Sequence, residues 1–233
     1  MEDSEKLVPR KNGEESDIDR EGDFDPRTEI GLMLITDDAI NQGIAEDIIV
    51  STLERLQKRS QSIEIVAAIN ISPLNMDQVR KIYPSLDDNY FEAFREFLGA
   101  TESLLVIYEN TNPEEREFDF IDELKRIKGK IKRHKNKGSP YGWSNAIREA
   151  IPLPGDRSRY ELLDEKIDKG NLSKKDYLNL THHLVHTPDN LSEFAELFLL
   201  MGDAQAEELL GSGRARKYIE WAKKHTEISM TTK

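Results

Sequence analysis

Cysteine is absent from this chain of 233 residues. Disulfides, iron–sulfur clusters and thiolate zinc sites are therefore excluded, and we expect a protein of the cytoplasm. Positive charge is also scarce, because 45 acidic residues oppose 33 basic ones and give a net charge of -12. This balance argues against nucleic acid or an anionic membrane as a partner. No apolar run approaches the roughly 20 residues of a transmembrane helix, and the N-terminus lacks the pattern of a secretion signal.

Composition divides the chain into three parts. Residues 1–27 are rich in acidic and poor in apolar side chains, which predicts a disordered acidic tail. Residues 28–202 are predicted to form one domain, interrupted at about 113–178 by an insertion whose later part, 138–178, is rich in proline and glycine. Residues 203–233 are predicted to be a helical C-terminal extension.

Short apolar runs predict four buried strands, at residues 30–35, 63–71, 104–108 and 177–185. Helices are expected between and after them. The order strand, helix, strand, strand, helix, strand is typical of an α+β fold, the ferredoxin-like split βαβ sandwich. We therefore expect a mainly antiparallel four-stranded sheet with added helices.

Apolar residues at helical spacing predict the helices of this arrangement. They are expected from residue 42 over about four turns, at 75–83, at 88–98, from about 118, at 191–201, and from 203 to about 224. The glycines at 211 and 213 predict a bend in the last of them.

Three of the five histidines, His182, His183 and His186, crowd into five residues at the end of the fourth predicted strand. A neutral imidazole at this strand-to-helix junction could attack phosphorus. The alternative is a polar strand end whose histidine is bonded to backbone or water. His182 and His186 also have the spacing of two metal ligands on a helix, but the segment is predicted to be a strand without a third ligand, so we predict no metal site.

A basic tract runs from Lys125 to Lys137 in this otherwise acidic protein. Such a tract is more often a solvated loop than a binding surface, and phosphate recognition is the alternative. It lacks interleaved aromatic residues, which argues against reading of single-stranded nucleic acid.

Three segments, in order, resemble nucleoside diphosphate kinases over roughly residues 28–201. Residues 34–49 resemble the opening strand, turn and helix start of that family, residues 79–94 its aromatic-bearing segment, and residues 184–196 its histidine signature. The resemblance implies that His186 is the phosphorylated histidine. It also implies that Tyr83 and Phe91 pack on the nucleotide base.

The resemblance further implies supporting and phosphate-binding positions around His186. Asp38 and Asp189 match two aspartates of the pattern, each near a predicted helix N-terminus, and Glu196 lies on the helix after the signature. The departures from the family are Thr36 where a lysine clamps the terminal phosphate, Pro188 for a serine, and His183 for an asparagine. The candidate counterparts of the family's loop arginines are Arg126 and Arg148.

The implied activity is ATP-dependent nucleoside diphosphate kinase activity, a transferase reaction through a phosphohistidine. The partners would be nucleoside di- and triphosphates, Mg²⁺ would arrive with the nucleotide, and the competent neutral imidazole would decline below about pH 6.5. The alternative is a catalytically impaired nucleotide-binding or protein-interaction module on the same fold. A third is another phosphate-handling enzyme whose site is built by residues 138–178. A homo-oligomer is left open.

Overall fold

A computed structural model describes residues 24–41, 43–83, 102–112, 118–128, 169 and 185–231, with backbone alone at residue 38 and residues 227–231. The expectations for the acidic residues 1–23, the helix at 88–98, the insertion at 138–178 and strand residues 177–184 therefore lie outside the described residues, apart from the single position 169.

The sheet has four strands, which are β1 (Ile30–Ile35), β2 (Ile63–Ile71), β3 (Ser103–Asn110) and β4 (Val185–His186). Their order is β2-β3-β1-β4, and every neighbouring pair is antiparallel. This confirms the predicted α+β fold with an antiparallel four-stranded sheet, in which the first strand is central. The described part of β4 forms the edge next to β1.

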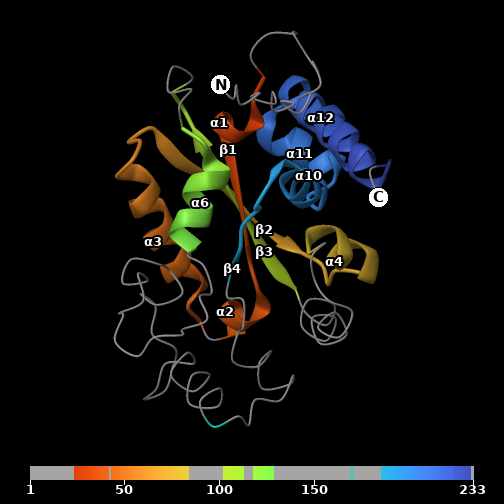
Figure 1. Cartoon of the computed structure of the whole chain (residues 1–233). Helices are drawn as coiled ribbons and strands as arrows, with labels where there is room; N and C mark the ends of the chain where they lie inside the picture. Colours follow the sequence, from red (N-terminus) through yellow and green to blue (C-terminus); the bar gives the residue numbers. More distant parts are fainter. Residues whose placement is uncertain are drawn as a thin grey trace, which may run out of the picture.

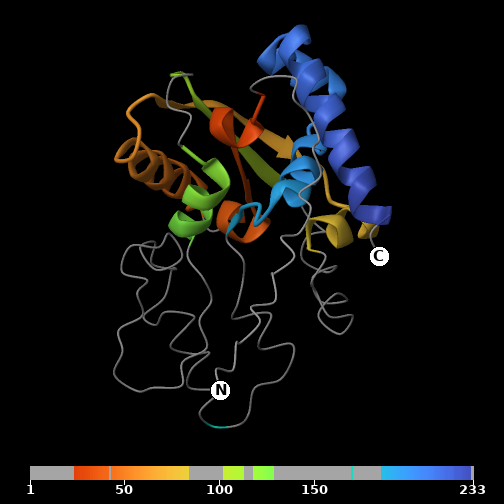
Figure 2. The same ribbon diagram turned by 45° about the horizontal axis from the view of Figure 1, so that its top comes forward.

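Helices cover both faces of this sheet (Figures 1 and 2). One face carries α3 (Ala45–Gln57) and α6 (Phe120–Lys128), and the other carries α4 (Met76–Ile82), α10 (Leu191–Leu199), α11 (Asp203–Leu210) and α12 (Ser212–Thr231). The short helices α1 (Pro26–Glu29) and α2 (Asp37–Asn41) flank β1. The predicted helices at 75–83, from 118 and at 191–201 are confirmed.

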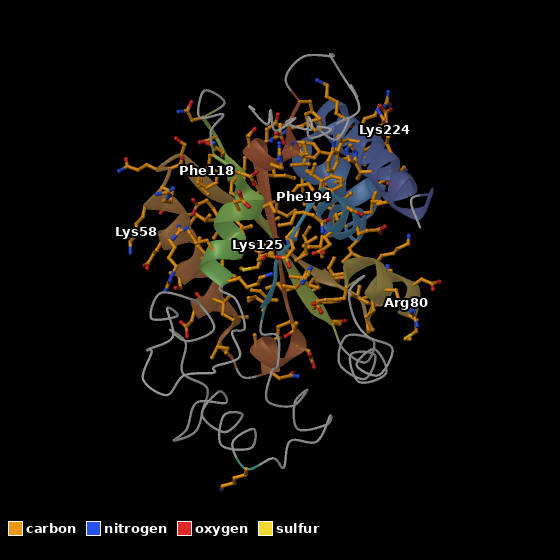
Figure 3. All side chains as sticks on the ribbon, in the orientation of Figure 1. Lys58, Arg80, Phe118, Lys125, Phe194 and Lys224 are labelled. Atoms are coloured by element: carbon orange, nitrogen blue, oxygen red, sulfur yellow. The ribbon has the colours of Figure 1, made fainter. Side chains whose placement is uncertain are left out.

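Strand β1 divides the apolar core into two layers, because alternate side chains of a strand point to opposite faces. Leu32 and Leu34 pack with α4, α10 and α12, whereas Met33 and Ile35 pack with α3 and α6. Phe194 and Phe118 lie on opposite sides of the sheet in the same way (Figure 3). All six residues of β1 are buried, which explains its nearly continuous apolar sequence.

Gly31 allows α6 to approach β1 closely. A Cβ atom at this position would lie 2.4 Å from Cδ1 of Phe120 and 3.0 Å from Cδ1 of Leu124. The first contact is too short for any residue larger than glycine unless the ring of Phe120 shifts, and the second is tight. The glycine within an otherwise bulky strand therefore sets how closely α6 lies to the sheet.

The two ends of the described chain differ from the sequence expectations. The predicted helix at 203–224 is two helices, because Gly211 between them has a φ of 77°, a left-handed conformation that interrupts a helix. At the other end, Asp25 caps α1 and Pro26 is buried, so the last residues of the expected acidic tail belong to the folded part. Among the described helices, none is both long and apolar enough to cross a membrane.

Candidate functional site

His186 is the last residue of β4 and lies directly opposite Leu34 of β1. Residues opposite each other in an antiparallel pair share a face, so the imidazole lies in the layer of α4 and α10. Only 6% of the residue is exposed. The chain then turns through Thr187, Pro188 and Asp189 into α10, which confirms that His186 stands at a strand-to-helix junction.

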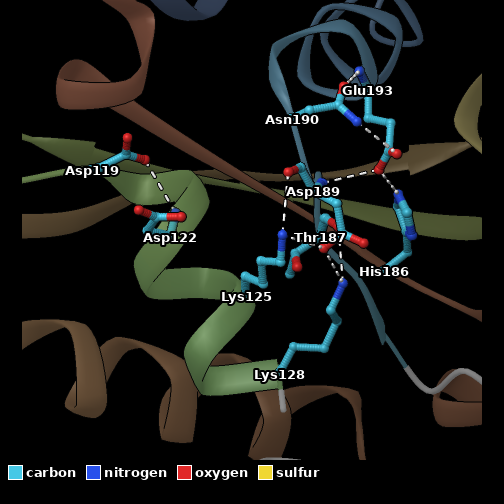
Figure 4. Close-up of polar contacts among 9 residues, drawn as sticks. All are labelled: Asp119, Asp122, Lys125, Lys128, His186, Thr187, Asp189, Asn190 and Glu193. Carbon is cyan, nitrogen blue, oxygen red and sulfur yellow. Dashed lines mark hydrogen bonds and ion pairs between the residues drawn. The ribbon is translucent and has the colours of Figure 1, made fainter. Parts of the chain in front are cut away.

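Glu193 of α10 faces the imidazole (Figure 4). Its Oε2 atom lies 3.8 Å from Nε2 of His186, slightly beyond hydrogen-bond length, and the two side chains are 11% and 8% exposed. A carboxylate at this position can accept a hydrogen bond from Nε2–H after a small shift, and its negative charge would stabilise a positively charged ring.

The same glutamate also holds the turn that follows β4. Its Oε2 accepts a hydrogen bond from the backbone N–H of Asp189 at 2.9 Å, and its Oε1 accepts one from Nδ2 of Asn190 at 3.0 Å. Asn190 in return caps α10 by accepting from the backbone N–H of Glu193. The carboxylate beside His186 is therefore held by two hydrogen bonds, and the backbone of the same residue by a third.

Burial raises the pKa of Glu193 above its ordinary value. The hydrogen bond from the Asp189 N–H and the positive charge of Lys128 act in the opposite direction, whereas the negative charge of Asp189 adds to the increase. The charge state of this carboxyl group thus depends on residues from two helices and the turn between β4 and α10.

Tyr83, at the C-terminal end of α4, packs on the other side of His186. The two ring centroids are 4.4 Å apart and the rings are inclined by 58°. The start of α4 is fixed by reciprocal hydrogen bonds between Asn75 and Gln78, which anchor the helix that carries the tyrosine. The sequence predicted that Tyr83 packs on a base, and the structure shows its contact with the imidazole itself.

Lys128, the last residue of α6, reaches the same turn from the opposite layer (Figure 4). Its Nζ donates to the carbonyl oxygen of Thr187 at 3.1 Å and to Oδ1 of Asp189 at 3.3 Å. Lys125, one turn earlier, lies 3.6 Å from the same carboxylate oxygen. The residue Lys128 is 8% exposed, an unusual burial for lysine, and its charge is compensated by Asp189.

Asp189 therefore has a different part in the structure from the one expected of a helix cap. Its carboxylate pairs with the two lysines, and the side chain of Asn190 caps α10 instead. The carboxylate–lysine pairs join α6 to the start of α10. Asp38 lies in α2, and its side chain is outside the described residues.

The other predicted phosphate- and base-binding residues have their own surroundings in the structure or lie outside the described residues. Thr36 follows β1, is 4% exposed, and its carbonyl oxygen accepts from the backbone N–H groups of Ala39 and Ile40. Arg126 is ion-paired at 2.5 Å with Glu123 on its own helix, and its side chain is 58% exposed. Phe91, Arg148 and His183 lie outside the described residues.

Glu196, the other carboxylate singled out from the sequence, lies 3.7 Å from Nζ of Lys81 and joins α10 to α4. Burial raises its pKa and the lysine opposes this effect. The glutamate that faces His186 is instead Glu193, one turn earlier. Its signal in the sequence is the spacing of Asn190 and Glu193, a helix cap followed three residues later by glutamate.

Within the described residues, no group of three His, Cys, Asp or Glu side chains is arranged to hold a metal ion. His182, the second member of the histidine pair with ligand spacing, lies outside them.

Comparison with known proteins gives matches in structure alone. No family model and no curated protein sequence matches the chain. Among solved structures, a nucleoside-diphosphate kinase from Borrelia burgdorferi with bound vanadate and ADP is 14% identical, with a TM-score of 0.43, and the match covers 72% of this chain and 83% of that one. An NDP kinase from Pyrobaculum aerophilum is 14% identical, with a TM-score of 0.41, over 74% of this chain and 94% of that one. The function of this chain is therefore inferred from its own residues.

Proposed function

We propose that the protein transfers the γ-phosphate of a nucleoside triphosphate to a nucleoside diphosphate through a phosphohistidine at His186. The observation that carries the proposal is the pairing of the buried imidazole with Glu193, whose Oε2 lies 3.8 Å from Nε2. A histidine acts as a nucleophile when it is neutral and when its second nitrogen is held by a partner. The sequence resemblance of residues 184–196 to the kinase signature supports the same assignment.

In this proposal each ring nitrogen has a separate task. Because Nε2 faces Glu193 at 3.8 Å, we assign the proton to Nε2 and the attack on the γ-phosphorus to Nδ1. The bond between the γ-phosphorus and the oxygen that bridges to the β-phosphate breaks, and the diphosphate leaves with the Mg²⁺ that arrived with it. Glu193 offsets the positive charge that develops on the ring. A second nucleoside diphosphate then attacks the phosphohistidine and regenerates the neutral imidazole.

The nucleotide contacts follow from the same assignment. Because Tyr83 packs against His186, we place the tyrosine beside the transferred phosphate and not beneath the nucleotide base. Phe91 keeps the base-packing role that the resemblance implies. Arg126 and Arg148 are the proposed phosphate ligands, and Arg126 would have to exchange Glu123 for a phosphate oxygen.

Labelling with γ-³²P-ATP and Mg²⁺ tests this function. We expect an acid-labile phosphoprotein that is discharged by an added nucleoside diphosphate and is lost in His186→Ala. His225→Ala is the matched control, because His225 stacks on Trp221 of α12 and takes no part in the site. Labelling that survives in His186→Ala would remove this residue from the reaction.

The second candidate is a nucleotide-binding or protein-interaction module without turnover. It is favoured by the 6% exposure of His186 and by the threonine at position 36, where the family has a cationic clamp. Loss of such a group costs on the order of a hundredfold in rate. Calorimetric binding of a nucleotide to a protein that never becomes labelled would select this module over the kinase.

A further inference from the structure

Two helices from opposite layers hold the turn that follows His186. α6 contributes Lys128, which contacts Thr187 and Asp189, and α10 contributes Glu193, which contacts the backbone N–H of Asp189. The turn belongs to the edge of the sheet, where β4 has β1 as its neighbour. A short edge segment is therefore fixed by side chains from both faces.

These contacts form a continuous path from Lys128 to the imidazole. The Nζ atom of Lys128 lies 3.3 Å from Oδ1 of Asp189, and the N–H of Asp189 donates to Oε2 of Glu193 at 2.9 Å. The same Oε2 atom lies 3.8 Å from Nε2 of His186. A displacement of Asp189 would therefore move the carboxylate that faces the ring.

The positive charge of Lys128 acts on the same groups. Lys128 is the most buried cation of the group, with a side chain 10% exposed, compared with 33% for Lys125 and 40% for Lys81. A buried charge is less screened by solvent and acts more strongly on its neighbours. Without Lys128, the carboxylates of Asp189 and Glu193 would present more negative charge to His186.

Two further ion pairs involve the helices that pack near the ring. Lys81 of α4 pairs with Glu196 of α10 at 3.7 Å, and Lys125 shares Asp189 with Lys128. The phenol of Tyr83 faces the ring from α4. Of these groups, Lys128 alone combines a buried ammonium group with a contact to the residue adjoining His186.

We propose that Lys128 is a positioning residue for His186. It fixes the turn through Thr187 and Asp189, and it balances the two carboxylates so that the imidazole stays neutral with its Nε2 proton directed at Glu193. The catalytic meaning of this role rests on the proposed phosphotransfer, whereas the effect on the ring can be measured without it. The role lies outside the sequence resemblance, because residue 128 is in none of the three matching segments.

NMR of the ring nitrogens in the full-length protein tests the proposal, with the His186 signals assigned by their loss in His186→Ala. In Lys128→Met we expect the pH midpoint of His186 to rise by about half to one unit, because the carboxylates are no longer offset. We also expect the share of the Nε2–H tautomer to fall, because the turn that holds Glu193 beside Nε2 is no longer fixed by Lys128. Lys128→Arg should restore both. Lys58→Met is the matched control, because it removes one exposed lysine charge at the end of α3.

The phosphotransfer readout should follow the NMR result. Because a higher midpoint leaves less neutral imidazole, phosphoenzyme formation in Lys128→Met should slow several-fold at pH 7 and recover at higher pH. Asp189→Asn removes a negative charge instead, so the midpoint of His186 should fall. This second variant keeps the charge argument testable if Lys128→Met does not fold.

An unchanged midpoint and tautomer in folded Lys128→Met would overturn the proposal, as would an equal shift in Lys58→Met. Failure of the underlying function has a different signature. If the wild-type protein takes up no label while Lys128→Met still shifts the His186 midpoint, the positioning role stands and the phosphotransfer does not.

Discussion

At the scale of single residues, the site depends on the several contacts of Glu193. Its two carboxylate oxygens accept hydrogen bonds from Asp189 and Asn190 and face the imidazole of His186. Burial makes this carboxylate costly to ionise and is the first cause of its raised pKa, which the hydrogen bonds from Asp189 and Asn190 oppose. The protonation of Glu193 therefore couples the stability of the protein to the charge beside His186.

Replacement of Glu193 by glutamine should reveal this coupling as a pH dependence. The folded pKa lies above the ordinary value of 4.5, so between these two values the folded state binds more protons than the unfolded state. The contribution of Glu193 to the free energy of unfolding is therefore greatest below pH 4.5 and is lost as the pH rises through the folded pKa. Urea unfolding across this range should show wild type losing stability relative to Glu193→Gln. A constant difference would contradict the prediction.

The sequence predicted some residues of the site and not others, for reasons of distance along the chain. His186 was predicted because a local cluster and a resemblance both include it. Glu193 has a local signal in its spacing from Asn190, but that spacing predicts a helix cap and does not reveal that the carboxylate faces His186. Lys128 has no local signal for its contact with Thr187, since 59 residues separate them.

At the scale of elements, α12 is joined to the opposite end of β1 from the histidine by a polar cluster. Arg214 pairs with Glu109 of β3 and lies 3.4 Å from Glu29. The hydroxyl of Tyr218 donates to Glu29 at 2.8 Å. Phe24 packs edge-on against the ring of Tyr218. The C-terminal helix is therefore attached both to the sheet and to the residues just before it.

Tyr218→Phe should weaken this attachment while preserving the aromatic packing. The hydroxyl donates to a carboxylate in a partly buried setting, so its loss should cost about 1.5 to 3 kcal/mol in the free energy of unfolding. Lys223→Ala on the same helix breaks only an exposed ion pair with Asp203 and should cost less than about 1 kcal/mol. Chemical denaturation of both variants measures the difference. Equal losses in the free energy of unfolding would argue against this hydrogen bond as the anchor of α12.

Most elements were predictable because their apolar period is strong. β2 coincides with the predicted strand at 63–71, and α4 and α6 begin within two residues of their expected starts. The break between α11 and α12 was expected only as a bend, because a glycine flanked by helical sequence can either continue a helix or adopt a positive φ. Helix α1 was not expected, since Phe24 and Pro26 acquire partners only in the folded protein.

At the scale of the whole molecule, the sheet separates two apolar layers of different origin. The layer of α3 and α6 comes largely from residues before 129, whereas the other layer combines residues of the strands and α4 with residues of α10, α11 and α12. The segment predicted to be an extension thus contributes buried side chains to the core, which are Ala206, Ala215, Tyr218, Ile219 and Ala222.

A chain that ends at Gly202 should therefore lose its cooperative fold. Deletion of residues 203–233 would expose apolar residues of α10, because Phe194 packs on Trp221 and Phe198 stacks on Tyr218 of α12. We expect strong binding of a hydrophobic dye and a broad thermal transition, measured against the full chain. A truncated protein with a sharp transition and no dye binding would show instead that residues 203–233 are a separable appendage.

The central place of β1 also has a consequence for synthesis on the ribosome. This strand is made early, yet its hydrogen-bonding neighbours are β3 and β4, and Asn110 must be translated before β3 is complete. Until β3 has been made, the nascent chain therefore carries β1 as an unpaired stretch of buried residues, which is the kind of segment that chaperones bind. Enclosure of this strand also has to wait for β4 and α10, because both pack against it and follow it far along the chain.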